Sequence, residues 1–394
     1  MSTTASSLLD YYRSHEFNPV PIDVEDRAVW EDHFAKRTNL YQRHLGIPLR
    51  LLRGSRVLEF GCNSGENALV LAAHGAELTL VEPNEQVLPR LHALFAEFGL
   101  QDHIARLEQQ GMDDFAPDEG GYDLVIAEGF LSTMTGRDGL LGRMCDAIGA
   151  GGLGVMSFND RYGLLLEQTR RACLYRVCEL AGVEDPRSAG SLALARRLFA
   201  DDFAKLSASR AFEVWWQDQL VNPFLESDWL WSYDEILPVL EARGFEFHAS
   251  SPRWAQVDDH TWYKNVSDTD SRRRQIREAW SHSLPFTLTG LAADTERAAP
   301  AQAIDAVAGL VASISRYTTR TESVETVTWS AALADFLQAS PHADVRAFGV
   351  QLGQVYEGLR ATTVEGVLAA WHGASRLRDL WGAPYHYLCF HRSL

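Results

Sequence analysis

Two glycines and one carboxylate in residues 56–84 have the types and spacing needed to bind a nucleoside-like ligand. Gly61 and Gly65 would let the backbone approach a ligand closely, and the helix expected after them would offer free N–H groups at its N-terminus. Glu82 comes after the next apolar run and can accept hydrogen bonds from two ribose hydroxyls. These features together predict a site for a nucleoside-containing cofactor.

The glycine spacing argues against a dinucleotide as that cofactor. The fingerprint G-x-G-x-x-G would require glycine at positions 63 and 66, where this chain has Asn63 and Glu66. A cradle for a pyrophosphate group is therefore not expected.

A strand, a turn and a helix must position these residues. Residues 56–60 form a short apolar run that predicts a strand buried in a parallel sheet. Residues 68–73 have a helical pattern that ends at Gly75, and residues 77–81 predict a second strand that Glu82 closes. The order predicts a βαβ unit with an acidic residue at the end of its second strand.

The run Glu59-Phe60-Gly61-Cys62-Asn63-Ser64-Gly65 resembles the first motif of class I S-adenosylmethionine (SAM)-dependent methyltransferases. That motif is usually an acidic residue, a spacer and Gly-x-Gly-x-Gly, and Asn63 replaces its middle glycine here. The resemblance implies SAM as the cofactor and S-adenosylhomocysteine as its product. It also implies that the turn surrounds the methionine part of SAM and that Glu82 binds the ribose. The cofactor residues expected in this region are Glu59, Gly61, Cys62, Asn63, Gly65, Glu82 and Pro83.

Two further strands are expected to bring acidic residues to the cofactor. Residues 104–108 predict the third strand, and the family places an acidic residue just after it against the adenine amino group. Here that residue is Asp113 or Asp114, and we favour Asp113. Residues 121–128 predict the fourth strand, whose carboxyl end lies at the ligand edge of a doubly wound sheet.

Glu128 and Phe130 follow that fourth strand and are expected near the transferred methyl group. The Glu128 carboxylate suits two roles equally well: it can accept a substrate proton, or it can bind the ammonium group of SAM. We therefore count Glu128 both as a candidate base and as a cofactor residue, and Phe130 as a substrate contact.

A polar cluster follows the fifth predicted strand, residues 153–158. Asn159, Arg161 and Tyr162 are expected to contact the substrate, and Asp160 is a candidate catalytic residue. His260 begins the last predicted strand and belongs to a polar and aromatic run, residues 258–264. Its pKa suits a base near neutrality, although a structural role is the commoner one. The candidate bases, in order of preference, are Glu128, Asp160, His248 and His260.

The predicted fold class is α/β, a Rossmann-like seven-stranded sheet with added helical regions. Its last two strands are expected at residues 245–250 and 260–264, and residues 385–390 are expected to form a last strand or an anchored end. We expect an N-terminal helical segment at 1–50, a SAM-binding domain at 51–266 and a helical C-terminal domain at 267–394. Within the SAM-binding domain, an insertion at about 162–228 is expected to form a lid over the substrate, as is usual in the family.

Side chains in these added regions have candidate roles of their own. Segments before the first strand often cover the cofactor in this family, so Tyr12 is expected to contact the substrate, and Tyr11, His33 and Tyr41 are further candidates. The arginines of the insertion either bind an anionic substrate or lie solvated on the surface. The C-terminal helices, expected at 304–317, 327–339, 345–359 and 364–380, could form a homodimer.

Composition narrows the choice of partner. The formal net charge of −17 argues against a nucleic-acid substrate, because binding phosphates needs a basic surface. The five cysteines form no C-x-x-C pair and do not cluster with other ligands at zinc spacings, so no metal site is expected. No apolar run reaches about 18 residues, so no membrane segment is expected. These features predict a cytoplasmic protein that acts on a small molecule.

The sequence therefore predicts methyl transfer from SAM to an oxygen or nitrogen atom of a small-molecule acceptor. The insertion and the helical appendage favour natural-product or sugar tailoring. Two alternatives stay open: methylation of a protein or peptide, and a scaffold that binds SAM without catalysis.

Overall fold

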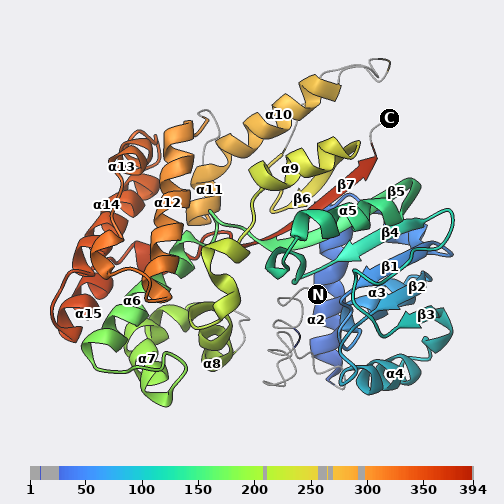
Figure 1. Ribbon diagram of the computed structural model, residues 1–394, viewed down its shortest axis with the longest axis horizontal. Coiled ribbons are helices and arrows are strands. Elements are labelled where there is room, and N and C mark those ends of the chain that lie inside the picture. Colours follow the sequence, from blue (N-terminus) through green and yellow to red (C-terminus); the bar gives the residue numbers. More distant parts are fainter. Residues whose placement is uncertain are drawn as a thin grey trace. The chain divides into compact units, whose positions relative to one another are not determined.

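The chain was analysed as a computed structural model that describes residues 26–206, 211–255, 269–291 and 298–392, together with Leu9 and Lys264. It divides into two compact units. One, which we call the sheet unit, comprises Met1–Phe158, Trp231–Arg277 and His386–Leu394. The other, the helical unit, comprises Asn159–Leu230 and Glu278–Tyr385 (Figure 1).

A seven-stranded sheet, ordered β3-β2-β1-β4-β5-β7-β6, forms the sheet unit and confirms the predicted Rossmann-like α/β class. Six strands lie where the sequence predicts them, although β5 starts earlier than expected. The strands are β1 (Arg56–Phe60), β2 (Glu77–Val81), β3 (Ile104–Glu108), β4 (Tyr122–Ala127), β5 (Ile148–Asn159), β6 (Phe245–Ser251) and β7 (Tyr385–Arg392).

Strands β1 to β5 are parallel neighbours, so their carboxyl ends meet at one edge of the sheet. The register places Phe60 of β1 opposite both Val81 of β2 and Ala127 of β4. The residues that follow these three strands are therefore neighbours at that edge, where ligands bind in open parallel sheets. They include the turn after β1, Glu82 and Glu128.

The seventh strand differs from the prediction. Of the predicted residues 260–264, those from 260 to 263 lie outside the described part of the chain. The seventh strand of the sheet is instead β7, close to the end of the chain, which runs antiparallel to β6 and lies between β5 and β6. Its burial explains this position: His386, Leu388, Cys389 and Phe390 are all buried, as expected of a strand covered on both faces.

Helices pack on both faces of the sheet (Figure 1). They are α2 (Arg27–Asn39), α3 (Glu66–Ala73), α4 (Leu88–Glu97), α5 (Arg137–Ala147) and α9 (Tyr233–Ala242), and α10 (Thr269–His282) begins in this unit. Helix α2 starts at Asp26, whose carboxylate accepts a hydrogen bond from the Ala28 N–H at 2.9 Å. It continues into a π-helical turn, Leu40–His44.

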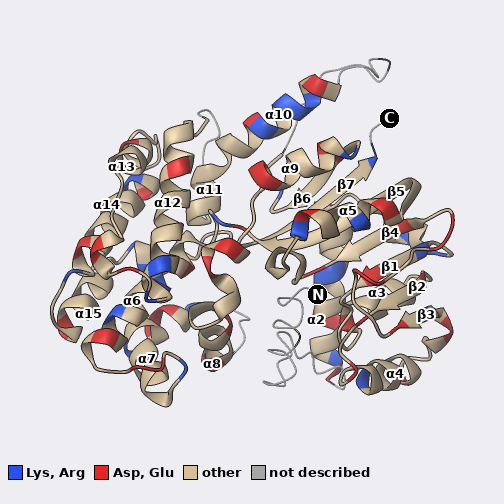
Figure 2. Ribbon diagram, viewed as in Figure 1, with Lys and Arg blue, Asp and Glu red and all other residues tan. Residues whose placement is uncertain are grey.

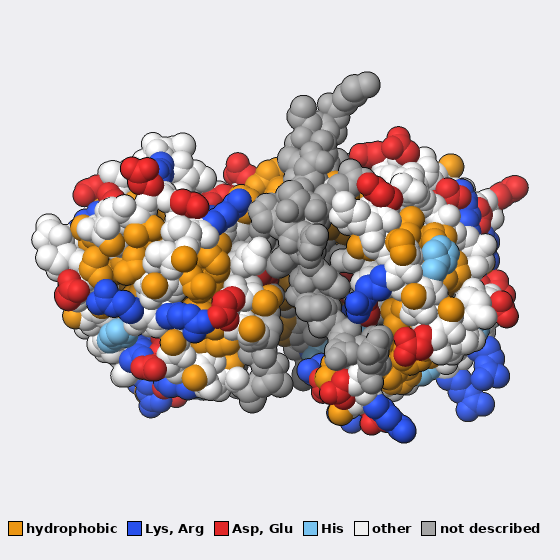
Figure 3. All heavy atoms as spheres, turned by 90° about the horizontal axis from the view of Figure 1, so that it is seen from below, with side chains coloured by type: hydrophobic (Ala, Val, Ile, Leu, Met, Phe, Trp, Pro, Cys, Tyr) orange, Lys and Arg blue, Asp and Glu red, His pale blue; other side chains and the backbone are white. Residues whose placement is uncertain are grey.

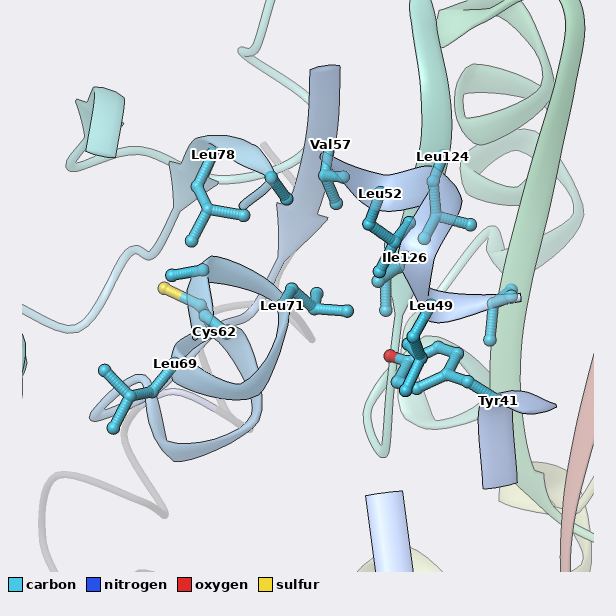
Figure 4. Packing of buried hydrophobic residues seen from close by; sticks show 14 of the residues in the cluster. Tyr41, Leu49, Leu52, Val57, Cys62, Leu69, Leu71, Leu78, Leu124 and Ile126 are labelled. Atoms are coloured by element: carbon cyan, nitrogen blue, oxygen red, sulfur yellow. The ribbon is translucent and has the colours of Figure 1, made fainter. Parts of the chain in front are cut away.

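The core on one side of the sheet fixes the turn after β1. Leu71 of α3 points from the helix toward Ile126, whereas Leu69 points the other way (Figure 4). Both belong to one buried cluster with the strand residues Val57, Leu78 and Leu124. Each such side chain contributes about 1.5–3 kcal/mol through burial. Because α3 is held in this way, the turn that precedes it has little freedom to move.

The helical unit combines two regions that the sequence analysis treated as separate domains. Helix α6 packs against α7, α11, α12 and α15, so residues of the predicted insertion and of the predicted C-terminal domain share one core. The helices are α6 (Leu165–Leu180), α7 (Ala189–Phe203), α8 (Phe212–Trp215), α11 (Leu284–Thr289), α12 (Ala301–Thr318), α13 (Ala331–Gln338), α14 (Ala343–Gly358) and α15 (Val364–Gly373).

The arginines of the predicted insertion are held by partners within the helical unit. Arg170 is fully buried, donates to the Leu380 carbonyl at 2.6 Å and lies 3.9 Å from the Trp381 ring centroid. Arg171, also buried, pairs with Glu226. These two arginines therefore stabilise the core of the unit, whereas Arg196 and Arg197 form half-exposed ion pairs with Glu213 and Glu365.

Candidate active site

The turn between β1 and α3 has three residues in the left-handed region of backbone space. Gly61, Asn63 and Gly65 have φ values of 67°, 49° and 87°. Gly65 is also the N-cap of α3, and no side chain in the described part of the chain caps that helix end. The first N–H groups of α3 are thus left for a ligand or solvent, as predicted from the glycine pattern.

The two glycines are also required by close side-chain packing. A Cβ atom on Gly61 would lie 2.8 Å from the ring of Phe130, and one on Gly65 would lie 3.1 Å from Leu91 and Phe95. Phe130, predicted to contact the substrate, therefore packs directly over the turn. Cys62 beside them is buried, and burial raises the pKa of its thiol well above the usual value.

Glu82 lies at the end of β2 and faces this turn. It is buried, and its two oxygens accept hydrogen bonds from the backbone N–H groups of Asn63 and Asn84, both at 2.8 Å. Burial raises the pKa of Glu82, and the two N–H groups oppose that shift. The carboxylate is thus fixed beside the turn, and Pro83 follows it in the chain.

Glu59, at the carboxyl end of β1, is buried, and the cation that acts on it, Arg37, is bound to Glu128. Its side chain is only 3% exposed, and Oε2 has no hydrogen-bond partner among the described residues. Burial, with the nearby Glu128, raises the pKa of Glu59 to about 8. The Oδ1 atom of Asn63 likewise has no hydrogen-bond partner among those residues.

Glu128 is the centre of a buried polar cluster. Its Oε1 accepts a hydrogen bond from Nη2 of Arg37 at 2.6 Å, and its Oε2 accepts one from Nη1 at 2.8 Å. The Arg37 guanidinium also donates to the hydroxyls of Tyr41 at 2.7 Å and Tyr387 at 3.3 Å. Glu128 also accepts hydrogen bonds from Asn67 Nδ2 at 3.3 Å and from the hydroxyls of Tyr387 at 3.4 Å and Tyr41 at 3.5 Å.

The α2 side chains of this cluster keep unused hydrogen-bonding atoms. Arg37 is 6% exposed, and its Nε has no hydrogen-bond partner among the described residues. Nε2 of His33, one helical turn earlier, is buried and also lacks one. Burial and the Arg37 charge lower the pKa of His33, so its ring is neutral near pH 7.

These unused atoms fit the methionine part of SAM. Glu59 Oε2 and Asn63 Oδ1 are acceptors that an ammonium group can satisfy, and Arg37 Nε is a donor that a carboxylate can satisfy. Buried polar atoms are rarely left without partners, so this set at one edge of the sheet is consistent with a ligand that carries both groups.

The remaining predicted residues have mixed placements. Asp113 and Asp114 are exposed in the turn after β3, and Asp113 lies 3.7 Å from Arg143. His248 lies on β6, with its ring 5.8 Å from that of His391. Tyr11, Tyr12 and His260 lie outside the described residues.

The polar cluster at residues 159–162 lies in the helical unit. Asp160 Oδ1 accepts hydrogen bonds from the N–H groups of Tyr162 at 3.0 Å and Gly163 at 2.7 Å, so this carboxylate shapes a turn. Tyr162 packs its ring against Trp280, and Arg161 donates to the Leu230 carbonyl at 3.5 Å. Asn159 ends β5.

Sequence reasoning missed Arg37, Asn67 and Tyr387. Arg37 precedes Tyr41 by four residues, a spacing that puts both on one face of a helix and was therefore a usable signal. Asn67 follows the glycine turn directly. Tyr387 belongs to the tail that was expected to form a last strand or an anchored end, but nothing in the sequence placed that tail beside Glu128.

The family model described as "Methyltransferase domain" matches residues 32–250, which is more than half of the chain. The chain therefore belongs to this methyltransferase family. The predicted family, class I fold and SAM cofactor are thereby confirmed. A search of curated proteins found no match.

Solved structures of methyltransferases also match. PKMT2 from Rickettsia typhi, in complex with AdoHcy, is 14% identical; the match covers 61% of this chain and 50% of that one, with a TM-score of 0.41. A SAM-dependent methyltransferase from Mesorhizobium loti is 22% identical over 29% of this chain and 54% of that one, with a TM-score of 0.26. The glycopeptide N-methyltransferase MtfA, complexed with sinefungin, is 21% identical over 32% and 50%, with a TM-score of 0.27. The chain thus spans about half the length of these proteins.

Further observations concern metal ligands, membrane-spanning helices and the charges on the surface. Within the described residues, no three His, Cys, Asp or Glu side chains gather as metal ligands, and all five cysteines are buried and free. No helix in the same part of the chain is long and apolar enough to cross a membrane. On the face drawn in Figure 3, basic side chains lie scattered among acidic and hydrophobic ones.

Proposed function

We propose that this protein transfers a methyl group from SAM to a nitrogen or oxygen atom of a small molecule bound beside Glu128 and Phe130. One observation carries the proposal. In a chain of this family, Glu59, Asn63 and Arg37 have buried side-chain atoms with no hydrogen-bond partner among the described residues, at the carboxyl edge of the sheet.

The residues around the turn would hold the cofactor in a fixed position. Glu59 and Asn63 would accept hydrogen bonds from its ammonium group, Arg37 Nε would donate to its carboxylate, and Glu82 would bind the ribose hydroxyls. When bound, SAM supplies an electrophilic methyl carbon. The protein contributes mainly by placing the acceptor in line with that carbon, and positioning of this kind accounts for a large part of the rate of bimolecular reactions.

The contacts of Glu128 favour an acceptor that needs no strong base. Both of its oxygens already accept hydrogen bonds from Arg37, and Asn67 and Tyr387 add further contacts. Both oxygens of Glu128 are therefore already engaged by hydrogen-bond donors of the protein. An amine that arrives deprotonated needs no such base, so we favour nitrogen over a high-pKa hydroxyl as the methylated atom.

The identity of the acceptor rests on the additional regions of the chain. The helical unit adds a second body to the methyltransferase fold, and this elaboration supports a natural product or a sugar as the acceptor. Substrate contacts by Tyr12, Asn159, Arg161 and Tyr162, adenine binding by Asp113 or Asp114, a base role for Asp160 or His260, and a homodimer through the C-terminal helices are parts of the same proposal.

Calorimetric titration with S-adenosylhomocysteine, with NAD as the control, tests the first half of the proposal. Binding of the former alone is the expected result. Transfer from methyl-labelled SAM to panels of amines, hydroxylated natural products, sugars and peptides then tests the second half. Labelling of peptides alone would favour a protein or peptide methyltransferase. Cofactor binding without transfer to any panel would favour a scaffold, and no cofactor binding would refute the proposed site.

A further inference from the structure

A cavity of about 350 Å³ lies in the sheet unit, away from the candidate active site. Its walls come from α9, β6, α10 and the end of β7. The volume falls within the range of roughly 300–1,000 Å³ typical of small-molecule sites. Leu237, Phe247 and Ile276 give it an apolar wall.

The strand register shows that this cavity is separate from the cofactor edge. Tyr387, near the start of β7, pairs with Ser251 and contacts Glu128 at the carboxyl edge. His391, which lines the cavity, pairs with Glu246 near the start of β6. His391 lies four positions after Tyr387 in the strand, which corresponds to about 13 Å of extended chain. A ligand in the cavity would therefore lie toward the opposite edge of the sheet.

Most charges around the cavity are paired, and one cation is not fully compensated. Arg272 lies 3.2 Å from Glu246, and Glu241 pairs with Arg277 of α10. Among the described residues, Arg273 has only a distant ion pair, 4.0 Å from the exposed Asp270. The basic stretch of α10 that contains these arginines is visible in Figure 2. The cavity thus has one cation available for an anionic ligand.

Two polar atoms that α10 contributes to the cavity also lack hydrogen-bond partners among the described residues. Nε of Arg273 and Oε1 of Gln275 are buried without a hydrogen-bond partner among the described residues. The imidazole of His248 is adjacent, and burial together with His391 lowers its pKa, so it is neutral near pH 7. The cavity therefore offers one guanidinium donor, neutral polar groups and an apolar wall.

We infer that this cavity is a second binding site, which takes a small monoanionic amphiphile. Arg273 would bind the carboxylate of the ligand, and Leu237, Phe247 and Ile276 would contact its hydrocarbon part. A medium-chain fatty acid has this chemistry.

Displacement of the fluorescent probe 1-anilinonaphthalene-8-sulfonate by octanoate tests this site in the full-length protein. We expect saturable binding of the probe, displacement by octanoate, and much weaker displacement by neutral 1-octanol. The variant Arg273→Gln should weaken octanoate binding by about tenfold or more, because it removes a hydrogen bond to a charged group. The matched control is Arg274→Gln, which changes an exposed arginine of the same helix and should bind octanoate like the wild type.

Two further measurements separate this site from the others. Ile276→Trp, which fills the cavity, should abolish octanoate binding while circular dichroism shows a folded protein. Excess S-adenosylhomocysteine should not displace the probe. The inference is overturned if octanoate does not bind, if Arg273→Gln and Arg274→Gln behave alike, if Ile276→Trp binds octanoate normally, or if S-adenosylhomocysteine displaces the probe.

Discussion

Each unit buries a carboxylate almost completely, but the two carboxylates differ in their hydrogen-bond and ion-pair partners. Asp202 of the helical unit is fully buried and accepts hydrogen bonds from Arg378 Nε at 2.6 Å and Trp371 Nε1 at 2.9 Å. Glu59 of the sheet unit is 3% exposed, and Arg37, the cation that interacts with it, is bound to Glu128.

The difference separates a structural charge from a charge kept for a ligand. A buried carboxylate is costly unless it is paired, so Asp202 fits a role in holding α7 to the chain near residues 371–378. Glu59 is left with a raised pKa and an oxygen without a hydrogen-bond partner in the described residues. That arrangement lowers stability and is expected where a bound ligand supplies the missing partner.

The largest effect should come from Asp202→Ala. The substitution leaves the Arg378 charge and the Trp371 N–H without their partner, and breaking a buried ion pair typically costs about 3–5 kcal/mol. Urea unfolding measures the loss. The affinity for S-adenosylhomocysteine, measured under conditions where the variant is folded, should stay unchanged. A stability close to that of the wild type would show that this pair contributes little.

The next largest effect is expected for Glu82→Ala, which should weaken binding of S-adenosylhomocysteine by about 1–3 kcal/mol. The substitution removes the acceptor proposed for the ribose hydroxyls. Calorimetry measures the change, and Glu97→Ala, on the exposed face of α4, is the control. An unchanged affinity in the Glu82 variant would refute the ribose site.

Glu59→Gln should weaken the same ligand by about tenfold, because a charged acceptor for the ammonium group is lost. It should also change the dependence of stability on pH. In the wild type the Glu59 pKa is raised from 4.5 to about 8 on folding, so the unfolded state releases its proton first. The contribution of Glu59 to the free energy of unfolding therefore falls as the pH rises from about 4.5 to about 8.

The variant should lack that fall, and urea unfolding at several pH values measures it. The binding of S-adenosylhomocysteine by the wild type should strengthen as the pH approaches 8, since the ionised carboxylate is the form that binds an ammonium group. Identical pH profiles for the two proteins would argue against a raised pKa at Glu59.

The smallest effect should come from Tyr387→Phe, which removes one hydroxyl from the Arg37–Glu128 cluster. A lost hydrogen bond of this kind costs about 0.5–1.5 kcal/mol, so S-adenosylhomocysteine should bind a few-fold more weakly. Tyr122→Phe is the matched control, because the buried Tyr122 hydroxyl has no hydrogen-bond partner among the described residues. Equal affinities for the two variants would show that the Tyr387 hydroxyl of β7 does not contribute to cofactor binding.

Local patterns were sufficient to predict the first half of the sheet. Residues 56–60 and 77–81 are short apolar runs in a βαβ order, and both strands have the predicted bounds. The acidic residues after these strands could be placed because parallel strands end at one edge. The resemblance to the methyltransferase family then predicted both the fold and SAM as the cofactor.

Long-range pairing could not be predicted in the same way. Residues 260–264 and 385–392 were both possible as the seventh strand. The choice depends on which segment fills the space between β5 and β6. The hydrophobic periodicity of a segment can identify a strand, but it does not show which strands are neighbours. The partners of Glu128 were missed for the same reason, since Arg37 and Tyr387 come from opposite ends of the chain.

The position of β7 has a consequence for synthesis of the protein. The strand lies inside the sheet, but it is synthesised after both of its neighbours, β5 and β6. Until then β5 and β6 lack the neighbour that separates them, and Glu128 lacks the Tyr387 hydroxyl. A chain that is cut short before residue 385 would contain the complete glycine turn and still have an open sheet. The sheet can therefore close only after the chain has been made through β7.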